Sequence, residues 1–255
     1  MRGIVISVWG QNGTGKTVLS AALTASLSVN FNVLLASPDK VNPAFALWLP
    51  DDKGMRFDSI GSTLEYPNLD VEYLTTTNSD QPYRIVPYPG DESIGLLGYL
   101  KDDDIDRYNP IEGQAAKRFI DTARSFADIT LIDGSDNPQE DGLTMTGLLN
   151  SDIIITLIEP NAKGISFTHA MKRYFLQCDK TAQHFLLAGS VRRDSPIQTV
   201  ESVIGRPFFD YLPDSDEVRK KINECRLFSG YKSEYGEKIA RIAQLVEEVI
   251  QDETR

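Results

Sequence analysis

The sequence predicts an α/β fold of three layers, α/β/α, in which a mostly parallel central sheet lies between two layers of helices. Apolar, β-branched runs that suit strands alternate along the 255 residues with amphipathic segments that suit helices. A hydrophobic content of 41% supplies enough apolar side chains for the core of such a fold. No repeat, low-complexity tract or linker interrupts the pattern, so residues 1–255 are interpreted as one domain.

The first predicted strand covers residues 4–9, and the first predicted helix covers residues 18–27. Between them stands the sequence GQNGTGKT, residues 10–17, which fits the pattern GxxxxGK[ST] of a phosphate-binding loop, or P-loop. Its glycines let the backbone approach phosphates, and the N–H groups of the loop and of the helix N-terminus point at them. The predicted nucleotide-binding residues are Gly10, Gln11, Asn12, Gly13, Thr14, Gly15, Lys16, Thr17 and Val18.

Two side chains of this loop carry its chemistry. Lys16 is expected to reach the β- and γ-phosphates of a nucleoside triphosphate and to act in its cleavage, and the Thr17 hydroxyl is expected to bind Mg²⁺. The cofactors predicted from this pattern are ATP or ADP and Mg²⁺. A chance match is disfavoured, because the strand and the helix that a P-loop requires flank it in the right order.

The remaining elements follow in order along the chain. Predicted strands cover residues 32–36, 83–86, 129–133, 153–158, 184–188 and 208–212. Predicted helices cover residues 113–126, 164–176, 196–204, 216–225 and 234–251. The polar stretch at residues 37–110 is rich in proline and glycine and holds only one of these strands, so it is expected to form mobile or functional loops.

Two aspartates at the ends of predicted strands are candidates for Mg²⁺ binding and for cleavage of the nucleotide's phosphates. Asp133 ends an apolar strand, a position from which an acid in P-loop proteins organises the Mg²⁺ shell; the alternative is a cap of the turn at Gly134 and Ser135. Asp39 lies just past the strand at 32–36, where a carboxylate could hold the attacking water or a metal-bound water. The alternative for Asp39 is a solvated loop residue.

Composition limits the class of protein and its partners. No apolar run approaches the roughly 20 residues of a membrane span and no signal sequence is recognisable, so a cytoplasmic location is expected. Two cysteines without ligand spacing argue against zinc and iron–sulfur sites. A net charge of −11 disfavours direct binding to DNA and to anionic lipid. The apolar stripe at residues 239–250 is flanked by acids, so packing onto the sheet is favoured over membrane insertion.

The order and spacing of these elements resemble the ParA/MinD family of partitioning and positioning ATPases. Residues 11–17, QNGTGKT, are similar to its deviant P-loop motif KGGxGKT, and residues 33–39, VLLASPD, to its VLLIDxD segment. Residues 127–135, ADITLIDGS, resemble its YDxxIIDxPP motif, and residues 151–160 resemble the ADxxLxxxxP strand that follows. Residues 205–222 are similar to the pilus-assembly branch called CpaE or TadZ.

Three positions depart from the family pattern. The signature lysine, which in the family's nucleotide-sandwich dimer reaches the partner's phosphates, is Gln11 here, and the first aspartate of the family's DxD is Ser37. The family's Asn-Arg pair near the adenine is not evident in residues 189–193. A neutral Gln11 brings no charge to the phosphoryl oxygens, so hydrolysis is expected to be slow, whereas binding of Mg²⁺-ATP is still expected.

The resemblance implies a P-loop NTPase module that binds ATP, is a weak Mg²⁺-dependent ATPase and switches with nucleotide occupancy to position or assemble another complex, such as secretion or pilus machinery or a partitioning system. It also implies a homodimer and a protein partner in a larger assembly, with recruitment to a membrane or pole by that partner as an open option. Two other functions stay open. One is a scaffold that binds ATP without cleaving it, and the other is a metabolic ligase on the same fold, which would need a substrate pocket beside Asp39.

Overall fold

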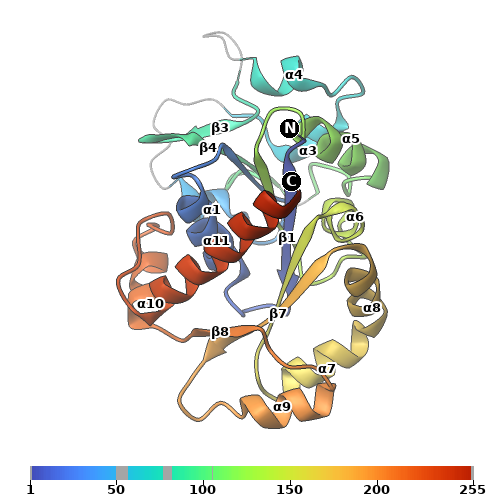
Figure 1. The fold of residues 1–255 in the computed structure, drawn as a ribbon. Helices are drawn as coiled ribbons and strands as arrows, with labels where there is room; N and C mark the ends of the chain where they lie inside the picture. The colour runs from blue at the N-terminus through green and yellow to red at the C-terminus, as the bar shows by residue number, and fades with distance from the viewer. Residues whose placement is uncertain (1, 50–56, 77–81, 105, 254–255) are drawn as a thin grey trace.

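The computed structural model describes residues 2–49, 57–76, 82–104 and 106–253 of the chain (Figure 1). The strands in these residues are β1 (Ile4–Gly10), β2 (Val33–Ser37), β3 (Val86–Tyr88), β4 (Asp91–Gly98), β5 (Ile129–Asp133), β6 (Ile153–Ile158), β7 (Gln183–Val191) and β8 (Asp210–Pro213). The helices are α1 (Lys16–Leu27), α2 (Phe45–Trp48), α3 (Ile60–Glu65), α4 (Val71–Thr75), α5 (Gly113–Ala123), α6 (Gly142–Asn150), α7 (Ala162–Ala170), α8 (Lys172–Thr181), α9 (Ile197–Ile204), α10 (Asp216–Asn223) and α11 (Glu234–Glu253).

The strands of the described residues form one sheet in the order β3-β4-β2-β5-β1-β6-β7-β8. Neighbouring strands are parallel except β3 and β4, which pair antiparallel at one edge. β1 lies between β5 and β6, and all seven of its residues are buried. A strand covered on both faces needs apolar residues on both, which explains the continuous apolar run in its sequence. The predicted three-layer α/β/α fold with a mostly parallel sheet is confirmed.

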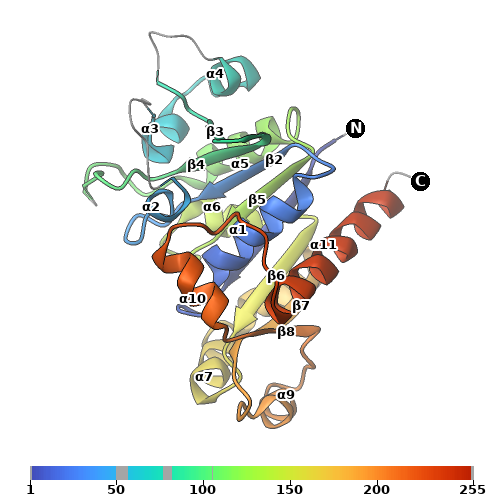
Figure 2. The same cartoon turned by 90° about the vertical axis from the view of Figure 1, so that its left-hand side faces the viewer.

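Helices cover both faces of this sheet (Figure 2). Successive side chains of a strand point to opposite faces, so Ile6 and Val8 of β1 belong to the apolar cluster that includes α1 and α11. On the other face, Val5 joins the cluster of α5, and Trp9 joins that of α6 and α8. The ring centroids of Trp9 and Phe175 are 5.5 Å apart, which anchors the end of β1 directly before the glycine-rich loop.

The apolar stripe near the C-terminus packs inside the protein, as the sequence predicts. Ile239, Ile242, Val246 and Val249 of α11 are buried in the same cluster as the apolar side of α1. The two helices lie side by side (Figures 1 and 2). Fully burying an aliphatic side chain contributes about 1.5–3 kcal/mol to the free energy of folding. Packing inside the protein therefore accounts for the apolar spacing of this helix.

Besides the short helices α2, α3 and α4, two elements are missing from the sequence prediction, namely β4 and α6. β4 begins at Asp91 and contains Gly95, so it lacks the continuous apolar run of the other inner strands. α6 begins at Gly142 and contains Gly147 and two threonines, which are poor helix formers. A Cβ atom at Gly147 would lie 2.6 Å from the Ser7 hydroxyl oxygen, so glycine is what lets α6 approach β1 closely. Tertiary packing overrides local propensity in both elements.

The stretch at residues 37–110 holds more regular structure than the sequence predicts. Its described part contains the short helices α2, α3 and α4 as well as β3 and β4. The predicted strand at 83–86 is displaced, because β3 begins at Val86 and Tyr83 forms an isolated parallel bridge with Phe57. The expectation of mobile loops also concerns residues outside the described ranges, namely 50–56, 77–81 and 105.

The predicted helix at residues 164–176 is in fact two helices. Met171 has φ −95° and ψ 13°, which departs from helical geometry and separates α7 from α8. The change of direction lets α8 lie along α6 while α7 lies near α9. The apolar spacing along this segment is nearly continuous, so periodicity alone could not locate the break.

Candidate nucleotide-binding site

The loop between β1 and α1 has the backbone shape that phosphate binding needs. Gly10, Gly13 and Gly15 have φ angles of 133°, 79° and 90°, a region that residues with a Cβ atom rarely adopt. A Cβ atom at Gly13 or Gly15 would meet no heavy atom within 4 Å, so the backbone there faces open space. At Gly10 a Cβ atom would lie 2.1 Å from the Leu157 carbonyl oxygen, so that glycine allows β1 and β6 to approach.

Helix α1 begins at Lys16, directly behind this loop. Its N-cap, Gly15, offers no side chain to the N–H groups of the first turn, and such N–H groups together with the helix dipole attract anions. Lys16 Nζ donates a hydrogen bond to the Gln11 carbonyl oxygen at 3.1 Å and so lies across the loop. Burial lowers the pKa of Lys16, and nearby carboxylates, Asp133 foremost, oppose that shift.

Asp133 ends β5, and its register partner on β1 is Val8. This pairing brings its carboxylate beside the first turns of α1, where the residue is only 3% exposed. The Ser20 hydroxyl donates to Asp133 Oδ1 at 3.0 Å, and the Thr17 hydroxyl also hydrogen-bonds the carboxylate. Burial raises the pKa of Asp133 to about 6, although these hydrogen bonds and Lys16 act in the opposite direction. A buried carboxylate beside a hydroxyl offers oxygen ligands for a divalent cation.

Asp39 lies two residues beyond β2 and lines the same pocket as Lys16. Its Oδ1 accepts hydrogen bonds from the backbone N–H groups of Val41 and Asn42, both at 2.9 Å. One oxygen of Asp39 therefore orders its own loop. Its negative charge opposes the lowering of the Lys16 pKa and adds to the raising of the Asp133 pKa, which places the carboxylate within electrostatic reach of both groups.

A pocket of about 410 Å³ opens beside the P-loop, between the segments that follow β2 and β5. Lys16 and Lys40 both line it, and Lys40 Nζ also donates to the Tyr108 carbonyl oxygen at 2.6 Å. Its lining also includes five carboxylates, namely those of Asp39, Asp106, Asp136, Glu140 and Asp141. The five carboxylates outnumber the two lysines, so the lining repels a phosphate unless a further cation lies between them. The composition of the pocket therefore favours a nucleotide that arrives with Mg²⁺ over one that arrives alone.

The loop after β5 is tied to α6 by hydrogen bonds. Asp141 caps α6 by accepting from the N–H groups of Leu143 at 3.0 Å and Thr144 at 2.9 Å. The Thr144 hydroxyl donates to the Asp141 carboxylate and accepts from the Ser135 N–H at 2.9 Å. Burial raises the pKa of Asp141. The segment that lines the pocket is thus bonded directly to the first turn of α6.

Gln11 is held by β6 of its own chain. Its backbone N–H donates to the Leu157 carbonyl oxygen at 2.9 Å, and its side-chain Oε1 accepts from the Glu159 N–H at 3.0 Å. Its carbonyl oxygen accepts hydrogen bonds from Lys16 Nζ and from the Thr14 hydroxyl, at 3.1 and 2.8 Å. Gln11 therefore helps to shape the loop and links it to the sheet.

Ser37 and Gly189 also lie beside the loop. Ser37 is buried at the end of β2, with its hydroxyl 3.5 Å from the Asp133 carbonyl oxygen. On the other side of the loop, a Cβ atom at Gly189 of β7 would lie 2.5 Å from the Thr14 carbonyl oxygen. The next residue, Ser190, has φ 53°. The end of β7 thus packs against the P-loop, where a small residue is required.

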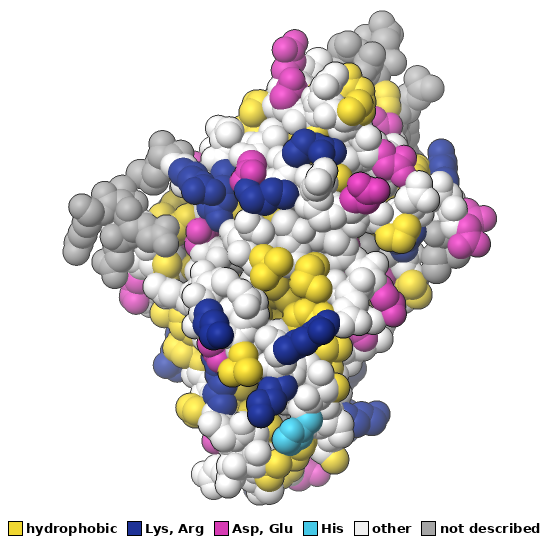
Figure 3. Space-filling model, turned by 90° about the vertical axis from the view of Figure 1, so that its right-hand side faces the viewer, with side chains coloured by type: hydrophobic (Ala, Val, Ile, Leu, Met, Phe, Trp, Pro, Cys, Tyr) yellow, Lys and Arg dark blue, Asp and Glu magenta, His cyan; other side chains and the backbone are white. Residues whose placement is uncertain are grey.

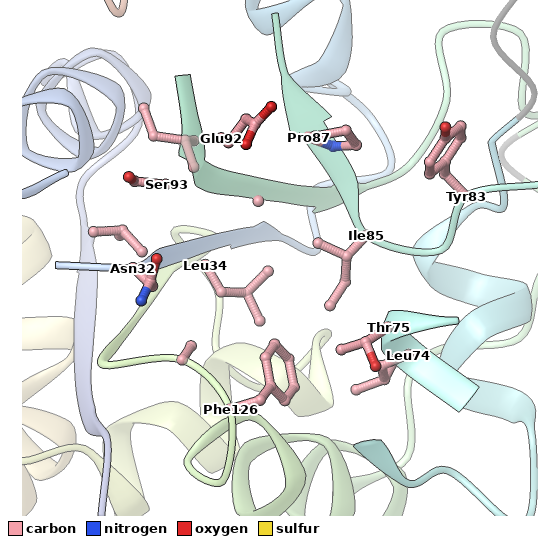
Figure 4. A pocket seen from close by; sticks show the side chains of 14 residues that line it. Asn32, Leu34, Leu74, Thr75, Tyr83, Ile85, Pro87, Glu92, Ser93 and Phe126 are labelled. Atoms are coloured by element: carbon pink, nitrogen blue, oxygen red, sulfur yellow. The ribbon is translucent and has the colours of Figure 1, made fainter. Parts of the chain in front are cut away.

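A second pocket, of about 530 Å³, lies at the opposite end of the sheet (Figure 4). Leu34, Ile85 and Phe126 converge on it, and the polar residue Asn32 at its edge is hydrogen-bonded to Asp128. The residues described as lining it include no lysine or arginine. Ligands of open α/β sheets bind beyond the carboxyl ends of the strands, whereas this pocket adjoins the amino ends of β2 and β5. Its position and chemistry do not suit a nucleotide.

Sequence reasoning did not identify Ser20, Asp136 and Asp141 as site residues. Ser20 could have been found from helical spacing, because it follows Thr17 by three residues and Lys16 by four, on the same side of α1. Asp136 and Asp141 stand in a polar loop without periodicity. No sequence signal places them, and they reach the pocket because β5 ends beside β1.

In the described part of the chain, no group of three or more His, Cys, Asp or Glu side chains is placed to hold a metal ion by itself. Mg²⁺ commonly takes one or two protein ligands and completes its shell with water and substrate phosphates. Thr17 and Asp133 suit that arrangement. The same residues of the chain include no helix with the length and apolar character that crossing a membrane requires.

No protein-family model matches the chain, and no curated protein matches it either. Solved structures do match. The ParA family ATPase from Chlorobium tepidum TLS has a TM-score of 0.74 at 15% identity, with 95% of this chain and 98% of that one covered. A candidate plasmid partition protein from Borrelia burgdorferi B31, bound to AMPPNP, has a TM-score of 0.74 at 17% identity, with 97% and 99% covered.

The septum site-determining protein MinD from Pyrococcus horikoshii OT3, complexed with Mg-ADP, has a TM-score of 0.71 at 19% identity, with 97% of each chain covered. These structural neighbours are ParA/MinD family ATPases at low sequence identity. The likeness extends over nearly the whole of both chains in each comparison. This chain therefore has the fold of the ParA and MinD P-loop ATPases.

Proposed function

We propose that residues 1–255 form one P-loop domain that binds Mg²⁺-ATP and acts as a nucleotide-dependent switch. The observation that carries the proposal is the buried carboxylate of Asp133, hydrogen-bonded to Ser20 and Thr17 next to Lys16. Mg-ADP in the MinD structure and AMPPNP in the partition protein support it. A calorimetric titration of ATP in the presence of Mg²⁺ tests the proposal, and Lys16→Ala is the variant expected to lose binding.

Each site residue has a role in this proposal. The backbone from Gly10 to Val18 binds the phosphates, and Lys16 neutralises the charge on them. Thr17 and Asp133 hold Mg²⁺, which supplies positive charge between the phosphates and the acidic pocket. Asp39 positions the attacking water. Turnover is slow, because the neutral Gln11 adds no charge to stabilise the transition state.

The proposed role of the switch is to position or assemble another complex. Structural neighbours named for plasmid partition and for septum-site determination support this class of function. Within it, we favour a secretion or pilus complex, because residues 205–222 resemble the CpaE/TadZ branch. A homodimer, a protein partner in a larger assembly, and a cytoplasmic location with recruitment to a membrane or pole by that partner complete the proposal.

A metabolic ligase is a second candidate, and one observation favours it. The pocket of about 410 Å³ that such an enzyme needs beside Asp39 is present. Its five carboxylates suit a cationic or metal-bound substrate. Phosphate release that needs only ATP and Mg²⁺ supports the switch, whereas release that needs a small organic substrate supports the ligase. Binding of ATP without multiple-turnover release of phosphate supports the third possibility, a scaffold that binds ATP without cleaving it.

The buried Asp133 predicts a pH dependence of the free energy of unfolding in the absence of ligands. Its pKa is raised from 3.8 to about 6, so between these values the unfolded chain binds fewer protons than the folded protein. Stability contributed by the neutral carboxyl is therefore present below about pH 4 and is lost as the pH rises to about 6. A shift of this size corresponds to about 3 kcal/mol.

Asp133→Asn keeps a hydrogen-bond acceptor for Ser20 and Thr17 and removes the charge. We expect the variant to unfold with nearly the parent's free energy at pH 4, and with a higher free energy than the parent at pH 7. Urea denaturation of both proteins at the two pH values, with EDTA present, provides the measurement. If the difference in free energy of unfolding between variant and parent stays constant with pH, the pKa of Asp133 is not raised in the folded protein.

Gln11 tests whether subunits pair across the nucleotide. If they do, Gln11→Lys adds a charge-assisted hydrogen bond to the partner's phosphate, and about 1.5–3 kcal/mol per site tightens the ATP-bound dimer roughly tenfold or more. Sedimentation of parent and variant, with and without ATP, measures this. Gln11→Met is the matched control, because it also removes the side-chain acceptor for the Glu159 N–H but adds no charge. Equal self-association of all three proteins in ATP would exclude pairing through this loop.

A further inference from the structure

The outward side of helix α6 is apolar and uncharged. The nine residues of α6, GLTMTGLLN, include no charged side chain. Leu149 is 47% exposed, and Met145, one turn earlier, is partly exposed. A helix at a protein surface usually carries polar residues on its solvent side, and a contiguous apolar patch there marks a contact surface. In Figure 3, which faces the layer of α5, α6 and α8, apolar side chains gather between groups of Lys and Arg.

Helix α8 lies beside α6 and adds lysines to this surface. The Thr181 hydroxyl donates to the Leu148 carbonyl oxygen at 3.3 Å, which aligns the C-terminal ends of the two helices. On α8, Lys172, Leu176 and Lys180 follow each other at intervals of four residues and therefore share one face. All three are exposed, Leu176 to 52%. Neither lysine has a carboxylate partner among the residues that the structure describes.

The charge of this layer is opposite to that of the whole protein. α5, α6 and α8 together contain five Lys and Arg but only two Asp, whereas the whole chain has a net charge of −11. Both acids are already paired with cations. Asp121 pairs with Lys117 on the same helix, and Asp179 pairs with Arg206, whose Nη1 lies 2.6 Å away. The charge that remains available at this surface is therefore positive.

We propose that Met145, Leu149, Lys172, Leu176 and Lys180 form a docking surface, the α6–α8 surface, for an acidic amphipathic helix of a partner protein. The apolar residues offer contacts for side chains spaced i, i+3, i+4 and i+7 on such a helix. The lysines attract its acidic flanks and exclude basic partners. An anionic membrane is a poorer fit, because a charged plane wider than the surface would also meet the acidic remainder of the protein.

The α6–α8 surface is bonded to the proposed nucleotide site through the first turn of α6. Ser135, two residues beyond Asp133, donates its N–H to Thr144, and Asp141 holds the same threonine and caps the helix. A displacement of that loop on nucleotide exchange would move the start of α6 with it. The biological role of the α6–α8 surface rests on the proposed function, because a switch that positions another complex needs a surface that binds a partner.

The test uses the whole protein without nucleotide, so a failure of ATP binding would not affect it. The probe is a fluorescein-labelled synthetic helix of 18 residues with leucines along one face and glutamates along both flanks. A second peptide with lysines in place of the glutamates is its control. Leu149→Glu and Lys180→Glu alter the surface. Val203→Glu on α9, where Val203 is 51% exposed, and Lys220→Glu on α10 are the matched controls.

We expect the parent to bind the acidic peptide at least tenfold more tightly than the basic one, with affinity falling as salt is added. Leu149→Glu and Lys180→Glu are expected to weaken this binding at least tenfold, and the two control variants to leave it unchanged. Unfolding temperatures within a few degrees of the parent's establish that the variants fold.

Four results would overturn the proposal. Two of them are equal binding of the two peptides and peptide binding that the surface variants do not weaken. Another is binding to vesicles of phosphatidylcholine and phosphatidylserine that the surface variants abolish while the peptide does not bind, which would assign the surface to a membrane. The fourth is self-association of the parent that the same variants abolish, which would assign it to a second copy of the chain.

Discussion

Lys16→Ala is expected to weaken the binding of ATP at least tenfold. Lys16 Nζ lies across the P-loop, where it bonds the Gln11 carbonyl oxygen and where the backbone at Gly13 and Gly15 is open. Hydrogen bonds to charged groups contribute about 1.5–3 kcal/mol, and about 1.4 kcal/mol corresponds to a factor of ten. Isothermal titration calorimetry with ATP and Mg²⁺ measures the change in Kd.

Lys180→Ala is the matched control for this experiment. Lys180 is exposed at the far end of α8, and its replacement by alanine removes the same charge from the protein. Its Kd for ATP is expected to equal that of the parent. Unchanged affinity of Lys16→Ala would mean that the loop before α1 is not the site of the phosphates. The fold would still be that of a P-loop ATPase, but the proposed function would be lost.

Asp39→Ala is expected to bind ATP with nearly the parent's affinity and to release phosphate at least a hundredfold more slowly. A carboxylate that positions the attacking water acts mainly in the transition state, so its loss lowers kcat more than it changes Kd. Positioned acid or base groups typically contribute about 10²–10⁴-fold to rate. Multiple-turnover phosphate release and calorimetry on the same preparations give the two numbers.

Asp39→Asn separates charge from loop structure. The Asn Oδ1 can accept the same two hydrogen bonds from Val41 and Asn42, so this variant keeps the ordered loop and loses only the carboxylate. We expect Asp39→Asn to be as slow as Asp39→Ala. Parent-like turnover in Asp39→Asn would leave Asp39 a loop residue, and absence of turnover in the parent itself would favour the scaffold.

The three layers and the P-loop could be predicted because their signals are local. The run from Gly10 to Thr17 depends on neighbouring residues for its turn geometry, and its three positive φ angles occur at glycines. Inner strands such as β1 and β5 are buried on both faces, so their sequences are mostly apolar. β4 and α6 gave no such signal, because each contains a glycine that a distant residue approaches closely, Ile85 at Gly95 and Ser7 at Gly147.

The class of fold could be predicted from the amino-acid sequence, which also singled out the glycine-rich loop before α1 and the aspartates Asp133 and Asp39 as candidates. Three features needed the folded chain: Asp133 is buried beside Ser20, burial raises its pKa to about 6, and the Gln11 side chain accepts a hydrogen bond from Glu159, 148 residues away. The groups involved in each lie far apart in the sequence. Glycine conformations and apolar runs act over a few residues, whereas burial, electrostatic shifts and a surface shared by two helices arise only when distant segments are packed together.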